Sequence, residues 1–415
     1  MTIHYSRHRR LKRARKSQHG GVLILIVVAL LPILAMVGLA VDASRAGYVK
    51  ARLQSAVDAA ALSAAKVLDQ TGNTAAAASA ATGSLNSNAE LFREFKEALE
   101  SGLVPTVQFS STAAPFQSGS SPSRYVRVSV QNLDFPVSLS AVIGMSTLKV
   151  RASAIAGPSA AVSYACNIFP VAACADLAVG KPHFGYVPGK VYGMRTTGGT
   201  TPGNFSFLSI EGNGASVLRE KLAGGYAECT AIGEQVLTKP GQSSGPVREG
   251  INTRFGEYKG GGVNDARYPP DVVTDEPNPA LSVDSKTGAI KQGSRTINQA
   301  SDLAVNHAIY QSDITAGRFD FQPRPSGTGA FLRRELAVPL VDCADVPKGR
   351  TLLPVVGFGC FFLLQRVASG GSGSQFFAEY LQDCEAGGRP GSNPPGANGG
   401  PYTILMFRDY DSPDS

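Results

Sequence analysis

The stretch GGVLILIVVALLPILAMVGLAV, from Gly20 to Val41, decides the organisation of this chain. It runs for 22 residues without a charged side chain. At a rise of ~1.5 Å per residue it forms a helix of ~33 Å, which is enough to cross a bilayer core of ~30 Å. Pro32 lies near its centre and bends such a helix without excluding a span, because its lost hydrogen bond is compensated within the membrane. We therefore predict a membrane-spanning helix over these residues.

Residues 1–19 form a basic arm ahead of the predicted span. This arm carries no acidic residue and seven basic ones, namely Arg7, Arg9, Arg10, Lys12, Arg13, Arg15 and Lys16. The positive-inside rule then holds the amino terminus in the cytoplasm and exports everything after the span. A cleaved secretory signal is the alternative, because Gly38-Leu39-Ala40 resembles a cleavage site. Twenty-two apolar residues are long for a signal core, so a retained anchor is favoured.

The bulk composition describes an exported part that is nearly neutral and rich in loops. The formal net charge of +7 matches the seven basic residues of the arm, so little net charge is left for the rest of the chain. Nucleic acid is therefore not implied as a partner. With 46 glycines and 26 prolines among 415 residues, long irregular segments are expected.

Cysteine usage points to an oxidising compartment. All six cysteines follow the predicted span, at Cys166, Cys174, Cys229, Cys343, Cys360 and Cys384. An even number in an exported chain predicts up to three disulfides. We favour Cys166 with Cys174, and Cys360 with Cys384, because each pair closes a short loop. The alternative is that some of the six cysteines are free, buried thiols.

Beyond the span the helical pattern continues without a breaker, through an alanine-rich stalk. Apolar residues recur at steps of three or four along one face, at Val49, Leu53, Val57, Ala60 and Ala64. Span and stalk together predict one helix that ends before Thr71. The apolar face either docks on other helices or is filled by the protein's own strands, and the sequence leaves both open.

Residues 71–157 read as a small α+β unit beside this stalk. A helix is predicted from Ser87 to Leu99, because Ser87 and Glu90 match a capping box. Alternation at period two and short apolar runs predict four strands, over Val104–Phe109, Tyr125–Val130, Phe135–Leu139 and Leu148–Ala154.

Residues 158–415 read as a larger, loop-rich α+β body. Apolar runs predict strands over Gly185–Val191, Phe205–Ile210, Val355–Leu364 and Tyr402–Phe407, and short helices over Ala215–Leu222 and Phe376–Asp383. Residues 239–246, 268–279 and 386–401 are expected to be coil. The overall prediction is an α+β chain in four parts: 1–19, 20–70, 71–157 and 158–415.

Catalytic and metal-binding patterns are weak, and we predict no catalytic, cofactor or metal site. Only His183 and His307 follow the span, which limits a hydrolase. Residues 241–245 fit the letters of G-x-S-x-G, but they lie in a coil between two prolines. Beyond the span, no Cys or His pair has zinc-site spacing. Three aspartates near the carboxyl end lack the glycine and glutamate of a calcium loop, at Asp409, Asp411 and Asp414.

The span and stalk also carry a family pattern. It consists of the glycine that opens the span, Pro32, the sequence GLAVD at residues 38–42, and LQSAVDAAAL at residues 53–62. On these residues the segment 20–66 resembles the amino-terminal domain of the TadG-like (TadE/TadG) proteins of the tight-adherence, or Flp, pilus assembly system.

The resemblance implies a non-enzymatic, single-pass protein of the bacterial inner membrane with a periplasmic body. Its expected partners are pilins or other pilus-assembly proteins, with homo-oligomers left open. Two departures limit what is carried over. DASRA at residues 42–46 lacks the last serine of a cation-dependent adhesion site. Leu25 or Ile26 stands where related pseudopilins have the glutamate needed for processing.

Two other functions stay open at this point. An anchored periplasmic hydrolase or carbohydrate-binding protein would use residues 158–415. A membrane stalk protein outside pilus assembly would use the same anchor.

Overall fold

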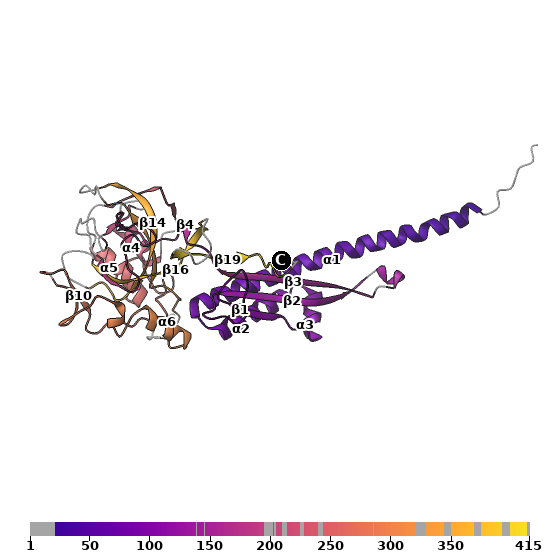
Figure 1. The fold of residues 1–415 in the computed structure, drawn as a ribbon, viewed down its shortest axis with the longest axis horizontal. Coiled ribbons are helices and arrows are strands. Elements are labelled where there is room, and N and C mark those ends of the chain that lie inside the picture. Colours follow the sequence, from indigo (N-terminus) through magenta and orange to yellow (C-terminus); the bar gives the residue numbers. More distant parts are fainter. Residues whose placement is uncertain are drawn as a thin grey trace, which may run out of the picture.

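The computed structural model describes residues 21–137, 139–144, 146–194, 202, 205–209, 214–224, 228–239, 244–284, 286–319, 329–343, 350–368, 375–391 and 399–412. The basic arm and Gly20 lie outside these residues. Figure 1 shows a long molecule in which one helix projects from one end of a small α/β part. A larger strand-rich part lies at the opposite end of that small part. The architecture is α+β, as predicted.

Helix α1 (Gly21–Thr71) joins span and stalk without interruption and contains Pro32. It ends one residue later than predicted, because Gly72 follows in the left-handed conformation (φ +62°) and its amide donates to the carbonyl of Leu68. From Ile24 onward the helix is long and apolar enough to cross a membrane. Most described side chains of this first half are exposed, for example Ile24 at 66% and Leu34 at 57%.

The second half of α1 is the centre of a separate apolar core. Helices α2 (Thr74–Ala89) and α3 (Arg93–Glu100) pack beside it, together with a four-stranded sheet of order β1-β2-β3-β19. The strands are β1 (Thr106–Ser110), β2 (Tyr125–Pro136), β3 (Thr147–Pro158) and β19 (Ile404–Phe407). We call α1 from Val49 onward, α2, α3 and this sheet the stalk domain.

The predicted helix from Ser87 to Leu99 is wrong in its limits. Asn73 caps α2, since its side-chain oxygen accepts from the amides of Ala75 and Ala76. Ser87 lies inside α2 and donates to the carbonyl of Gly83. The capping pattern therefore coincides with the end of one helix, and the chain bends before α3 begins at Arg93.

The sheet of the stalk domain differs from the prediction in one strand. The first, second and fourth predicted strands are confirmed as β1, β2 and β3. Phe135–Leu139 is no separate strand, because β2 continues to Pro136 across an irregularity between Val130 and Leu133. The remaining strand of the four-stranded sheet is β19. It comes from the carboxyl end of the chain and pairs antiparallel with β3.

A central sheet organises the body beyond the stalk domain. Its order is β6-β15-β14-β13-β5-β7, and β9 pairs with the start of β14. These strands are β5 (Val171–Cys174), β6 (Val191–Met194), β7 (Phe205–Phe207), β9 (Gln235–Leu237), β13 (Glu335–Val341), β14 (Leu352–Leu363) and β15 (Phe376–Leu381).

Both faces of this central sheet are covered. Helices α4 (Ala215–Gly224) and α5 (Ser244–Asn252) pack on one face, and α6 (His307–Thr315) packs on the other. Neighbouring residues of β14 accordingly point into different cores, Phe361 toward α4 and α5 and Phe362 toward α6.

Short strands complete the body. They are β4 (Val162–Cys166), β8 (Cys229–Ala231) and β17 (Gly387–Pro390) in one sheet, β10 (Leu281–Val283), β11 (Ile290–Gln292) and β12 (Arg295–Thr296) in another, and the pair β16 (Asp383–Glu385) and β18 (Gly400–Tyr402). Single turns of 3-10 helix are η1 (Ser140–Ile143), η2 (Thr253–Phe255) and η3 (Ala300–Asp302).

Most of the other sequence predictions for the body hold in part. The strand Val355–Leu364 and the helix Ala215–Leu222 are confirmed by β14 and α4. The strand Phe205–Ile210 is seen as β7, with Ile210 outside the described residues. Tyr402–Phe407 divides between β18 and β19.

Other predictions for the body are wrong. The helix Phe376–Asp383 is strand β15, whose six residues are all buried, so its sequence FFAEYL shows no alternation of apolar and polar residues. Strand β6 begins only where the predicted strand Gly185–Val191 ends. Two stretches expected to be coil contain structure, since α5 begins at Ser244 and residues 386–401 carry β17 and most of β18.

All six cysteines form disulfides, as Cys166–Cys229, Cys174–Cys343 and Cys360–Cys384. The third pairing is the one predicted. The predicted Cys166–Cys174 bond is wrong, because strand pairing and not loop length brings the sulfurs together. Cys166 lies opposite Cys229 in the β4–β8 ladder. Cys174 ends β5, which runs parallel to β13 and so lies close to the segment after it.

Leu53→Ala should destabilise the stalk domain by about 2 to 5 kcal/mol, because Leu53 is fully buried and the shorter side chain leaves a cavity. Chemical denaturation of the full chain in detergent measures the change. Leu91→Ala is the matched control, because Leu91 is 78% exposed. An equal loss in both variants would contradict the described core.

Replacing both members of Cys174–Cys343 with alanine should cost more stability than replacing Cys360 and Cys384. All four residues are buried, but the first bond spans 169 residues and the second only 24. Loop entropy in the unfolded chain then favours the first bond by roughly 2 kcal/mol. Denaturation of the two double variants measures this difference, and peptide mapping without reduction checks the pairing. A Cys166–Cys174 peptide would refute it.

Candidate functional site

The apolar face predicted on the stalk is part of the protein's own core. Val49, Leu53, Val57, Ala60 and Ala64 are each 0% exposed. They pack among side chains of α2, α3, β2 and β3. Of the two alternatives, the structure shows the one in which the protein's own elements fill this face. These residues are therefore not available as a docking surface.

Small side chains in this core let two helices approach closely. Ala60 and Ala64 on α1 are fully buried in the same cluster as Ala77 and Ala81 on α2. Alanine at such positions removes the bulk that would hold helix axes apart. The alanine-rich composition of the stalk is thus used for packing within the chain.

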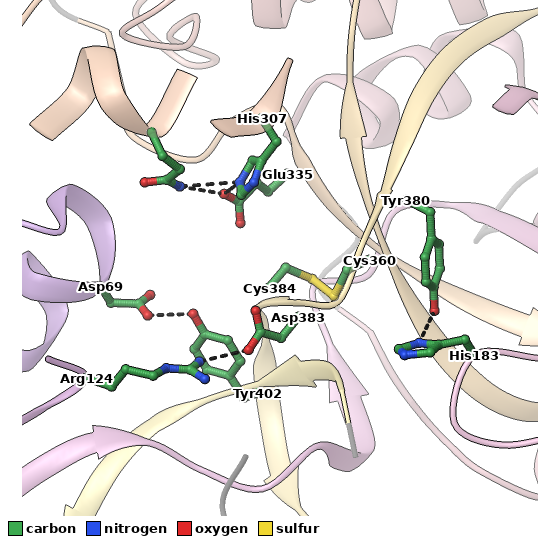
Figure 2. The surroundings of a disulfide bond; sticks show 11 residues. Asp69, Arg124, His183, His307, Glu335, Cys360, Tyr380, Asp383, Cys384 and Tyr402 are labelled. Carbon is green, nitrogen blue, oxygen red and sulfur yellow. Dashed lines mark hydrogen bonds and ion pairs between the residues drawn. A yellow bond between two sulfur atoms is a disulfide. The ribbon is translucent and has the colours of Figure 1, made fainter. Parts of the chain in front are cut away.

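A group of polar residues from distant parts of the sequence lies where the stalk meets the body. Figure 2 shows this junction site, which we define by Asp69, Arg124, His307, Glu335, Asp383 and Tyr402. They come from α1, the segment before β2, α6, β13, β16 and β18. All six line a cavity of about 230 Å³. The cavity thus lies between the stalk domain and the body.

Asp69 is the most perturbed acid of the junction site. The Tyr402 hydroxyl donates to its Oδ1 at 2.5 Å, whereas its Oδ2 is buried with no hydrogen-bond partner among the described residues. Burial raises the pKa of Asp69 to about 7, against the lowering effect of the Tyr402 hydrogen bond. The charges of Glu385 and Glu335 raise this pKa further, and Lys66 lowers it.

Ion pairs and hydrogen bonds around the cavity connect stalk and body. Arg124 pairs with Asp383 at 2.9 Å, and its guanidinium lies over the Tyr402 ring. Lys66 of α1 pairs with Glu385. At the end of α1, the Thr315 hydroxyl of α6 donates to the carbonyl of Thr71 at 2.6 Å.

The disulfide Cys360–Cys384 positions the two acids that face the stalk. Cys384 is the middle residue of β16, and the bond ties this short strand to β14 of the central sheet. Because alternate residues of a strand point to opposite sides, Asp383 and Glu385 point away from the disulfide. Both then reach their partners on the stalk side, Arg124 and Lys66.

His307 forms an imidazole–carboxylate pair. Its Nε2 donates to Oε1 of Glu335 at 2.8 Å, and the Gln311 amide lies beside both. Burial lowers the pKa of His307, but the hydrogen bond and charge of Glu335, with the charges of Glu379 and Asp383, give a net rise. This pair can hold a proton between stalk and body.

His183 lies elsewhere, against a different partner. Its Nδ1 shares a hydrogen bond with the Tyr380 hydroxyl at 3.1 Å. A hydrolytic triad also needs a nucleophile within hydrogen-bond reach of the imidazole. In the part of the chain that the structure describes, neither His183 nor His307 has a ring hydrogen bond to serine, threonine or cysteine.

Two of the three carboxyl-terminal aspartates serve as ion-pair partners. Asp409 and Asp411 each accept from the Arg127 guanidinium at 2.7 Å, and Asp409 also accepts from the Ser153 hydroxyl. Asp414 lies outside the described residues. Among the residues described, no group of three or more His, Cys, Asp or Glu side chains is arranged to hold a metal ion.

The sequence did not point to the junction site. Its members are spread from Asp69 to Tyr402, and none belongs to a local motif. Only His307 was singled out from the sequence, because it is one of two histidines after the span.

The G-x-S-x-G pattern of residues 241–245 is described only in part. Residues 241–243 lie outside the described residues, and Ser244 and Gly245 begin α5.

The elevated pKa of Asp69 predicts a pH dependence of stability. The pKa of Asp69 in the folded protein lies above its ordinary value of 3.8. Its stabilising contribution to the free energy of unfolding is therefore fully present below about pH 4 and is lost as pH rises through about 7. Asp69→Asn keeps the Tyr402 hydrogen bond without the charge. At pH 8 it should be more stable than the parent chain by roughly 1 to 3 kcal/mol.

Unfolding of both proteins between pH 4 and 8 measures this difference. His307 contributes in the same direction, because its folded pKa is also raised, so only the difference between the two proteins reports on Asp69. Asp134→Asn is the control, because Asp134 forms an exposed ion pair with Lys149. Parallel pH profiles for the parent and Asp69→Asn would contradict the description.

Comparison with known families gives one match. Residues 20–67 match the family model described as putative Flp pilus-assembly TadE/G-like. No curated protein and no solved structure matches the chain. The matched residues cover the span and the part of the stalk whose apolar face is buried beneath α2 and the sheet. The amino-terminal region of this chain is therefore Tad-like, which relates the protein to Flp/Tad pilus assembly.

Proposed function

We propose that this protein is a non-enzymatic, membrane-anchored component of a Flp/Tad-type pilus assembly or secretion system, and that it docks to pilins or other assembly proteins. The match of residues 20–67 to the Tad family model carries the proposal. The structure supports it by the unequal burial of α1. Side chains from Ile24 to Val41 are mostly exposed and apolar, whereas those from Val49 to Leu68 form the core of the stalk domain.

The proposed topology is a single span with the amino terminus in the cytoplasm and the body in the periplasm. The basic residues ahead of the span support this orientation. Three disulfides in the body support an oxidising compartment. Protease treatment of spheroplasts should remove an epitope at the carboxyl end and spare one at the amino end. The reverse pattern would overturn the orientation.

Docking is assigned to surfaces outside the stalk core. Within the membrane, Leu34 and Val37 are more than half exposed and offer an apolar helix face to neighbouring spans. In the body, Leu177 and Val179 are exposed at 48% and 66% on a turn before β6. These two regions are the places to look for partners.

Deletion of the coding sequence should abolish pili, and the full-length chain should restore them. A photoreactive amino acid at Leu34 or Val179 in the restored strain should crosslink to a pilin or another pilus-assembly protein. The same group at Leu53 is the control, because this buried position should crosslink only within the chain. Normal pili in the deletion strain would refute the proposal.

A non-enzymatic role predicts that both histidines of the body are dispensable for pilus assembly. His307→Gln retains a hydrogen-bond donor for Glu335, and His183→Gln retains one for Tyr380. The double variant should fold, as judged by its unfolding transition, and should assemble pili at the parental level. Loss of pili by a folded double variant would instead support an enzyme that uses an imidazole.

A further inference from the structure

The hairpin formed by β2 and β3 reaches back along α1 toward the membrane span. Strand β2 ends at Pro136 and β3 begins at Thr147, and the turn between them contains η1. Figure 1 shows this turn beside α1, well away from the body. We call the described residues of this turn, 137, 139–144 and 146, the hairpin tip.

Two contacts fix the hairpin tip to α1. The Asp42 carboxylate accepts from the backbone amides of Leu139 at 3.0 Å and Ser140 at 2.6 Å, and Asp42 is only 1% exposed. One helical turn earlier, a Cβ at Gly38 would lie 2.8 Å from Cβ of Leu139. Glycine therefore allows the tip to lie directly against the helix at this level.

These contacts set the tip at the level where the span ends. Gly38 and Asp42 belong to the last apolar turn of α1 and the residue after it, so the tip overlaps the final ~5 Å of the apolar run at ~1.5 Å per residue. Arg45, the first basic residue after the span, donates to the carbonyl of Pro136 and pairs with Glu94. Charged groups therefore gather just behind the tip.

The tip itself is uncharged and partly apolar. Residues 137–147 read VSLSAVIGMST and contain no charged side chain, whereas the strands behind them carry the ion pair Asp134–Lys149. Leu139 is 48% exposed although it is held beside an exposed apolar helix. An uncharged loop with an exposed leucine beside a membrane span fits a lipid surface, because the leucine and the apolar helix face are removed from water together.

We infer that the hairpin tip inserts into the membrane interface beside α1, as a second lipid contact of the chain. The occupant of its exposed face is the leaflet that α1 crosses last. Irregular backbone needs its polar groups satisfied in such a setting. Asp42 satisfies two amides, and the Gly144 amide donates to the carbonyl of Ala141. This contact would fix the rotation of the stalk domain relative to the membrane.

The chain contains no tryptophan, so single tryptophans report on each position. The inference rests on the proposed membrane anchoring, and the experiment therefore includes a reporter of that anchoring. Full-length Leu139→Trp, Leu34→Trp and Leu177→Trp are reconstituted into phospholipid vesicles with and without brominated acyl chains. Leu177 is the matched control, because it is a leucine of the same 48% exposure located in the body.

Brominated chains should quench the emission of Leu139→Trp and Leu34→Trp and leave that of Leu177→Trp unchanged. Quenching of Leu34→Trp alone would overturn the inference while leaving the anchoring intact. No quenching of either would overturn the anchoring as well. A third outcome is that the Leu139→Trp emission is blue-shifted but not quenched, and that this shift is lost when the protein is diluted in lipid. It would show that a second copy covers the tip, and it would also overturn the inference.

Ala141→Trp provides a second reporter in the tip, since Ala141 is exposed. Each variant is first compared with the parent by its unfolding transition in detergent. Quenching at both tip positions in folded protein supports insertion, and its absence at both refutes it.

Discussion

The structure depends on one continuous helix, α1. Its apolar side chains are mostly exposed in the first half and lie in the protein's own core in the second half. Up to about Val41 most described side chains of α1 are exposed, and from Val49 the same kind of side chain is buried by the chain's own α2 and sheet. Burying a leucine or valine in this core stabilises it by about 1.5 to 3 kcal/mol each. The stalk domain therefore cannot detach from the helix without losing its core, so the anchor and the folded part share one continuous helix.

The body is tied to that element at both the beginning and the end of its sequence. Strand β3 leads into the body, and β19 returns from it to pair with β3. Between these covalent connections, the junction site adds the pairs Arg124–Asp383 and Lys66–Glu385. The Cys360–Cys384 bond holds β16, and with it both acids, against the central sheet. Forces on the body would thus pass to the stalk through a paired strand and a polar contact.

In the proposed function, this arrangement would hold the body in a defined orientation over a membrane. The Tad-like segment contains the span, Gly38, Asp42 and the buried stalk face, so the matched residues are those that join membrane and folded domain. Asp69 and the His307–Glu335 pair lie at the other end of the stalk. The raised pKa values of Asp69 and His307 make the contact between stalk and body sensitive to pH.

Several features followed from the sequence alone because local physics decides them. The absence of charge over 22 residues predicts a span, and apolar steps of three and four predict the helix to Thr71. Alternation predicts β1, β2 and β3. In contrast, β15 is buried on both faces, so its sequence FFAEYL gave no period to distinguish strand from helix.

Only the tertiary structure decided which distant segments meet. It paired β19 with β3, joined Cys174 to Cys343, and gathered Asp69, Arg124, His307 and Tyr402 around one cavity. It also showed that the chain fills its own stalk face, a choice that the sequence left open. Local patterns record the periodicity and solvent preference of a segment. They do not record its partner, because partner choice depends on the free energy of the whole packed arrangement.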